Sequence, residues 1–276
     1  MVSRAGEGSQ CVISESPVDQ GDWARFSRNL LESTLLDISQ YRPEQMQKRV
    51  SEVAAGAGTT IGGLADRIKA SPHDAKIVLH LVSIHTTDLF RDPDRWLELQ
   101  EKVVPELLEA RPRIRAWSAG CANGAESYSL AAALTLMDVD CDILATDLDE
   151  IALGQAEFGI FPEIECTDVP ATVRELFFEP CTEGIVARES LRSHIAFQQH
   201  NLLHEPPATD FDLICCRNVS IYLTDYAKET LFQRLLSALR PGGYLFLGAT
   251  ERIFSPRDVG FESEFPGFYR KPGQPG

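Results

Sequence analysis

The chain has 276 residues, of which 43% are hydrophobic, and this is enough to bury a sizeable core in one large or two smaller domains. Its formal net charge of −15 disfavours nucleic acid as a partner, because phosphate contacts are made by clustered Lys and Arg. The sequence has no run near the roughly 18 apolar residues of a membrane span, and its first residues lack the apolar core of a signal peptide. We therefore expect a cytoplasmic protein that is not inserted in a membrane.

Seven cysteines without paired metal spacing favour reduced, buried thiols and no metal site.

The N-terminal third is predicted to be helical. Residues 1–20 are rich in Gly, Ser and Glu without periodicity, and we interpret them as a flexible leader. From Trp23 the apolar positions recur at helical spacing, and further helical patterns cover 45–53, 61–70 and 75–83. These patterns predict a small all-α N-terminal domain over residues 21–90. A helical linker is expected over 91–112, since three prolines punctuate this stretch.

From residue 113 onward, apolar strand-like runs alternate with helical patterns. The expected strands are 114–117, 143–145, 213–216 and 244–248, and the expected helices are 128–137, 151–157 and 225–239. This alternation predicts an α/β domain with a doubly wound, mainly parallel sheet and helices on both faces. Ligands bind such sheets outside the carboxyl ends of the strands, where Gly120, Asp147 and Asn218 are expected.

Residues 115–130 predict a binding corner made of a strand, a glycine turn and a helix. Gly120 and Gly124 allow the backbone to approach a ligand, and a helix start presents free N–H groups. Asp147 ends the next strand-like run, where an acidic side chain typically binds ribose hydroxyls. Ala122 departs from the dinucleotide fingerprint, and there is no Walker Lys-Ser/Thr. The pattern therefore indicates an adenosine ligand without a pyrophosphate.

Six sequence blocks, in their order along the chain, resemble motifs of the CheR family of chemotaxis receptor methyltransferases, which are protein-glutamate O-methyltransferases. The blocks are Thr-Thr-Asp-Leu-Phe-Arg-Asp at 86–92, Trp-Ser-Ala-Gly-Cys at 117–121, Ala-Thr-Asp-Leu-Asp at 145–149, His-Asn-Leu-Leu at 200–203, Phe-Asp-Leu-Ile-Cys-Cys-Arg-Asn-Val at 211–219 with Ile-Tyr at 221–222, and Pro-Gly-Gly-Tyr-Leu-Phe-Leu-Gly at 241–248. The resemblance implies a class I, Rossmann-like methyltransferase domain over 113–276 that uses S-adenosylmethionine and releases S-adenosylhomocysteine. It also implies a small antiparallel β-subdomain at about 161–200, with short strands at 185–187 and 195–197, and an antiparallel closing strand at 268–271.

The resemblance also implies the site residues. Arg91 and Tyr222 match the two polar side chains that the family places beside the transferring methyl group, and they are the expected catalytic residues. The expected cofactor-binding residues are His85, Thr87, Arg91, Gly120, Glu126, Asp147, Asn201, Leu202, Arg217 and Asn218. Glu126 is expected near the cationic methionyl end and Asp147 at the ribose, whereas His85 stands where the family has Asn. The structural alternatives are a helix cap for Arg91, a core position for Tyr222, and a carboxylate complementing a helix dipole for Glu126.

The expected function is methylation of glutamates in the cytoplasmic helical region of a methyl-accepting receptor, by a monomer. The family's basic docking helix is reduced here to Lys48 and Arg49, and the loop at 179–184 has a single glycine. We therefore expect weak docking through the N-terminal domain, independent of a receptor pentapeptide. Residues 248–251 read Gly-Ala-Thr-Glu where the family commonly has Gly-His-Ser-Glu. Two alternatives remain open, a cofactor-binding regulatory module without turnover and a small-molecule carboxyl methyltransferase.

Overall fold

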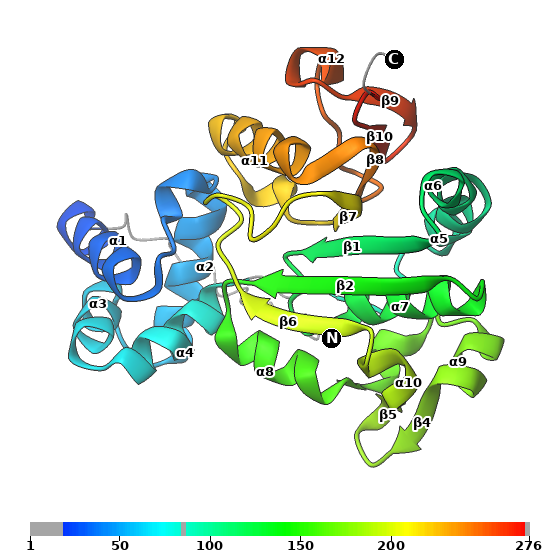
Figure 1. The fold of residues 1–276 in the computed structure, drawn as a ribbon. Coiled ribbons are helices and arrows are strands. Elements are labelled where there is room, and N and C mark those ends of the chain that lie inside the picture. The colour runs from blue at the N-terminus through cyan, green and yellow to red at the C-terminus, as the bar shows by residue number, and fades with distance from the viewer. Residues whose placement is uncertain (1–18, 84–86, 274–276) are drawn as a thin grey trace, which may run out of the picture.

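The computed structural model describes residues 19–83 and 87–273 (Figure 1), so His85 and nearly all of the expected leader lie outside the described residues. The N-terminal helices are α1 (Gln20–Thr34), η1 (Ile38–Gln40), α2 (Pro43–Gly56), α3 (Ile61–Ala70) and α4 (Pro72–Val82). Four of them begin with a polar side chain that accepts a hydrogen bond from a backbone N–H of the first turn, namely Asp19, Asp37, Thr60 and Ser71.

The helical region has a hydrophobic core of its own. Phe26 and Leu30 of α1, Val50 of α2 and Leu64 of α3 are almost completely buried in it. These side chains recur at the three- and four-residue spacing that puts one stripe of each helix against its neighbours. The helical patterns of the sequence are thus confirmed as packed helices.

The second part is built on a seven-stranded sheet with the order β6-β2-β1-β7-β8-β10-β9. Its strands are β1 (Arg113–Ala119), β2 (Asp140–Asp147), β6 (Ile195–Gln199), β7 (Phe211–Cys216), β8 (Leu239–Leu247), β9 (Glu262–Phe265) and β10 (Phe268–Arg270). The first five run parallel, and β10 lies antiparallel to β8 and β9. The predicted class I methyltransferase fold, including its antiparallel closing strand, is confirmed.

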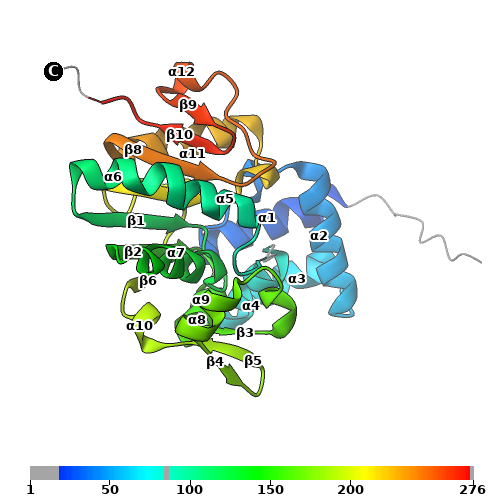
Figure 2. The same ribbon diagram turned by 90° about the vertical axis from the view of Figure 1, so that its right-hand side faces the viewer.

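Alternate side chains of the strands enter two different cores, so the sheet is covered on both faces. In β7, Leu213 and Cys215 pack with the layer of α7 (Ala125–Leu136), whereas Ile214 and Cys216 pack with α11 (Asp225–Ala238). All six residues of β7 are buried, as expected for a central parallel strand. Figure 2 shows α7 at the level of β2 and the helix α6 (Val104–Ala110) above β1, near β8.

The segment expected as a linker packs on the sheet. It forms α5 (Pro93–Glu98), a π-helical turn η2 (Leu99–Val103) and α6 without a break. Trp96 lies edge-on against Phe246 of β8, with ring centroids 5.5 Å apart, and Leu99 and Val103 are fully buried. The widened turn lies directly before Pro105, which has no N–H to donate.

One strand of the expected β-subdomain belongs elsewhere. The small antiparallel sheet consists of β3 (Ile160–Phe161), β5 (Gly184–Ala187) and β4 (Phe178–Cys181). The strand predicted at 195–197, however, is part of β6, which pairs in parallel with β2 in the main sheet. That placement was wrong because a short apolar run fixes a strand but not its partner. The remaining helices are α8 (Glu150–Phe158), η3 (Glu163–Cys166), α9 (Ala171–Phe177), α10 (Glu189–Arg192), η4 (Ser220–Tyr222) and α12 (Pro256–Val259).

Within the described ranges, no helix has the length and apolar character needed to cross a bilayer. The same residues contain no group of three or more His, Cys, Asp or Glu side chains suited to hold a metal ion.

Candidate active site

The turn after β1 requires glycine at its first position. Gly120 has φ +80, and a Cβ there would lie 2.8 Å from Cγ2 of Val219 and 3.4 Å from Cδ1 of Leu202. Gly124, with φ +88, ends the turn and begins α7. Ala122 between them also adopts a left-handed conformation, with φ +47. The backbone therefore turns tightly at the carboxyl end of β1 and leaves a concave surface in front of the helix.

Asp147 joins this turn to the end of β2. Its Oδ2 accepts a hydrogen bond of 2.9 Å from the backbone N–H of Ala122, and its Oδ1 accepts one of 3.0 Å from that of Asp149. Asp149 is buried and accepts hydrogen bonds from two N–H groups at the start of α8. The carboxylate predicted to bind a ribose thus also shapes the turn beside it.

A cavity lies at the carboxyl ends of β1, β2, β6 and β7, which point toward the N-terminal helices in Figure 1. The chain leaves β1 toward β2 on one side and returns to β7 on the other, so the cavity lies at the topological switch of the sheet. The predicted site residues that line it are Thr87, Gly120, Asp147, Asn201, Leu202, Arg217, Asn218 and Tyr222. The fold thus brings most of the predicted residues together around one cavity.

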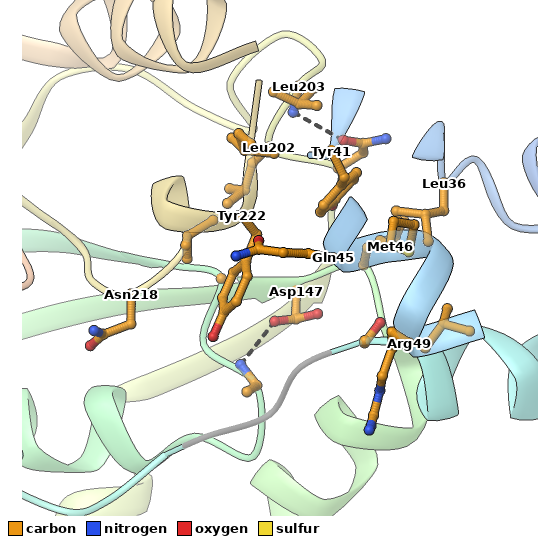
Figure 3. Close-up of a pocket in the computed structure, with 18 of the residues that line it drawn as sticks. Leu36, Tyr41, Gln45, Met46, Arg49, Asp147, Leu202, Leu203, Asn218 and Tyr222 are labelled. Carbon is orange, nitrogen blue, oxygen red and sulfur yellow. Dashed lines mark hydrogen bonds between the residues drawn. The ribbon is translucent and has the colours of Figure 1, made fainter. Parts of the chain in front are cut away.

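Helix α2 and the residues before it form the opposite wall, as Figure 3 shows. Tyr41, Arg42, Gln45, Met46 and Arg49 line this wall. These residues were not among those predicted from the sequence to bind the cofactor. Their spacing along one face of α2 was a usable signal, but nothing in the sequence shows that this face meets the sheet edge.

Tyr41 joins the two parts of the protein. Its ring packs against both the core of the helical region and the core under α11. Burial raises the pKa of its hydroxyl to about 12, and the carboxylates of Asp147 and Asp37 add to this rise. Residues 40–42 also bond to the loop that carries Tyr222, since the N–H of Arg42 donates to the carbonyl of Tyr222 over 2.9 Å. The helical region is therefore tied directly to the expected catalytic loop.

The residues on both sides of Arg91 have an unusual backbone conformation. Phe90 and Asp92, on either side of it, both have φ +57, which is rare for residues other than glycine. The carbonyl of Arg91 accepts hydrogen bonds from Nη2 of Arg217, over 2.7 Å, and from Nε1 of Trp96, over 3.0 Å. Arg91 itself does not line the cavity among the described residues.

Arg217 has two sides with different roles. Its Nη2 holds the carbonyl of Arg91 and the carboxylate of Asp92, each over 2.7 Å, and its guanidinium lies over the rings of Trp96 and Phe246. The side chain is only 4% exposed, and its Nε is buried without a hydrogen-bond partner in the described structure. Arg217 also lines the cavity, so it links the segment of Arg91 to the cavity wall.

Glu126 lies behind the turn rather than in the cavity wall. Its Oε1 accepts a hydrogen bond of 2.7 Å from Oγ of Ser118. Burial raises the pKa of its carboxyl to about 7, although Arg217 and Ser118 favour the charged form.

Thr87 fixes the segment before Arg91 to the glycine turn. Its Oγ1 donates to Oδ1 of Asn123 over 2.7 Å, and Nδ2 of Asn123 donates to Oε2 of Glu165 over 3.0 Å. Asn201 and Leu202 follow β6, where Oδ1 of Asn201 accepts from the N–H of Leu203 over 2.9 Å. Each of these side chains thus has a structural contact that also places it at the cavity.

The glycine turn, the acidic end of β2 and the cavity at the switch point define a class I methyltransferase that uses S-adenosylmethionine. The model of the CheR methyltransferase SAM-binding domain matches residues 85–264, which is more than half of the chain. The chain therefore belongs to the CheR methyltransferase family.

Relatives agree with this assignment over nearly the whole chain. A chemotaxis protein methyltransferase of Listeria monocytogenes is 33% identical over 254 residues, which cover 91% of this chain and 97% of the relative. The corresponding protein of Listeria innocua has the same identity and coverage. Chemotaxis protein methyltransferase Cher2 of Pseudomonas putida is 33% identical over 209 residues, or 70% of this chain and 76% of that protein.

Proposed function

We propose that this enzyme transfers the methyl group of S-adenosylmethionine to glutamate side chains in the cytoplasmic helical region of a methyl-accepting receptor. The observation that carries this proposal is the cavity in which Tyr222 and Asp147 face one space, closed by α2 on the far side (Figure 3). The family membership and the relatives named as chemotaxis methyltransferases support the choice of substrate. A cytoplasmic location follows from that substrate.

The bound cofactor supplies a methyl group on a sulfonium sulfur, which a glutamate carboxylate accepts to give a methyl ester and S-adenosylhomocysteine. An ionised carboxylate needs no strong base, so the protein's task is to align it and exclude water. Tyr222, which lines the cavity, would donate a hydrogen bond from its hydroxyl to the incoming carboxylate, and Arg91, which does not line it, would act on that carboxylate by its charge. Asp147 would hold the ribose hydroxyls, and Glu126, which lies behind the turn, would act on the cationic methionyl end by its charge.

Tyr222→Phe and Arg91→Ala test these two roles. Each is expected to lower methyl transfer from labelled cofactor about tenfold or more, because each removes one hydrogen-bonding group at the reacting carboxylate. Tyr226→Phe is the matched control, since Tyr226 lies on the neighbouring helix and is 75% exposed. Unchanged turnover in both site variants would remove them from the reaction.

Docking on the receptor is proposed to be independent of a C-terminal receptor pentapeptide. The hairpin of β4 and β5 pairs Cys181 with Gly184, so only two residues connect its strands and no long loop is present to hold a peptide. The contact is instead assigned to α2, where Lys48 is exposed and Arg49 reaches the cavity wall. A receptor whose tail has been removed should be methylated at an unchanged rate. A loss of methylation that parallels tail removal would contradict this.

A further inference from the structure

Glu251 is a buried carboxylate with a complete set of hydrogen-bond donors around it. It follows β8 and is 3% exposed. Its Oε2 accepts from the backbone N–H groups of Asn218 and Gly248, over 2.5 and 2.9 Å. Its Oε1 accepts from the N–H and the Oγ of Ser220, over 2.8 and 2.7 Å. All four are donors, which matches an ionised carboxylate, because that group accepts only.

These contacts fix the loop between β7 and η4. Asn218 has φ +60, in the left-handed region that asparagine adopts more readily than most residues other than glycine. Ser220 opens the helical turn that ends with Tyr222. Asn218, Val219 and Tyr222 all line the cavity, although Glu251 does not. One carboxylate outside the cavity thus sets the backbone that carries three of its wall residues.

Gly248 belongs to the same arrangement. A Cβ at this position would lie 2.7 Å from Oε2 of Glu251 and 3.1 Å from the N of Asn218. Glycine therefore leaves the space that the carboxylate occupies. Ala249 and Thr250, which differ from the commoner family sequence, are both exposed. The departure at 249–250 changes the surface and leaves the buried contacts in place.

We propose that Glu251 is a positioning residue for methyl transfer, which acts through Asn218 and Tyr222 without touching cofactor or substrate. The proposal rests on the proposed function only in its use of Tyr222. Glu251→Gln keeps the size of the side chain but turns an –NH₂ group toward at least one backbone N–H that now has no acceptor. The loop is then released from the conformation with Asn218 in the left-handed region.

A double-mutant cycle on turnover tests the proposal. Glu251→Gln is expected to lower kcat about tenfold in the wild type and to have little further effect in Tyr222→Phe, because the loop then has no catalytic hydroxyl to place. Thr250→Ala is the exposed neighbouring control and should retain wild-type kcat. An equal factor in both backgrounds would show a general structural defect and overturn the proposal.

A second cycle measures binding of S-adenosylhomocysteine by calorimetry, with Glu251→Gln, Asn218→Ala and the double variant. Non-additive losses of affinity are expected, and additive losses would contradict the coupling. This calorimetric cycle tests the role of Glu251 even if Tyr222→Phe leaves turnover unchanged. Unchanged turnover in that variant would count against the proposed function alone. If Glu251→Gln does not fold, Gly248→Ala displaces the carboxylate without removing its charge and should show the same couplings.

Discussion

Replacing Glu126 by Gln should make the protein more stable at alkaline pH. The carboxyl has a pKa of about 7 in the folded protein, raised from 4.5 mainly by burial. Between these two values the folded state holds a proton that the unfolded chain has already lost. The free energy of unfolding therefore falls as pH rises from about 4.5 to about 7 and stays at the lower value above that range. A neutral Gln side chain has no such dependence.

The size of the effect follows from the two pKa values. A shift from 4.5 to about 7 corresponds to about 3 kcal/mol, and the partial exposure of Glu126 to solvent reduces this to about 2 kcal/mol. Gln still offers an oxygen to the hydroxyl of Ser118, so the hydrogen bond there is kept. The free energy of unfolding of Glu126→Gln should thus exceed that of the wild type by about 2 kcal/mol at pH 8 and equal it near pH 4.5.

Urea unfolding at pH 4.5, 6, 7 and 8 measures this difference. Glu183→Gln, at an exposed position on the β4–β5 hairpin, is the control and should follow the wild type at every pH. The same Glu126 variant should bind S-adenosylmethionine more weakly at pH 8, because it lacks the negative charge proposed to face the methionyl cation. A stability difference between Glu126→Gln and the wild type that does not change with pH would refute the reasoning.

Three further predictions concern the ribose-binding carboxylate Asp147, the glycine turn at Gly120 and the buried guanidinium of Arg217. Asp147→Ala should weaken S-adenosylhomocysteine binding by about 1–3 kcal/mol in calorimetry, because two ribose hydrogen bonds are lost; equal affinity would remove Asp147 from the site. Gly120→Ala should destabilise the protein by at least about 1–2 kcal/mol in thermal unfolding, since φ is +80 and the new Cβ meets Val219. Gly154→Ala is the control, because this glycine lies inside α8 with open space around it, and it should stabilise the protein by about 0.5–1 kcal/mol in the same experiment. Arg217→Lys should lower both turnover and stability, because an ammonium does not reproduce the planar guanidinium that lies over the rings of Trp96 and Phe246; wild-type values of both would contradict this role of Arg217.

The sequence predicted the sheet well where hydrophobic pattern alone decides the structure. The run at 213–216 is apolar at every position and forms the central strand β7, buried on both faces. The run at 195–197 was equally clear as a strand, but its pairing with β2 is set by tertiary contacts at the sheet edge. The hydrophobic pattern therefore predicted the strand but not the strand with which it pairs.

The same distinction applies to the site. Gly120 and Asp147 were predicted from a local strand, turn and helix, so their roles depend on residues close in sequence. Tyr41 and Met46 lie about 70 residues before β1 in the sequence, and they line the cavity because the helical region packs against the strand ends. Glu251 was visible as part of a motif, but its partners Asn218 and Ser220 are more than 30 residues away. Such contacts have no local signal in one sequence.

Incubation of receptor-bearing membranes with the enzyme and methyl-labelled S-adenosylmethionine tests the proposed methyl transfer. We expect label on the receptor that mild base releases as methanol, as a glutamate methyl ester requires, and we expect this label to be lost in Tyr222→Phe. No label on any receptor by an enzyme that binds the cofactor, or label that resists base, would contradict it.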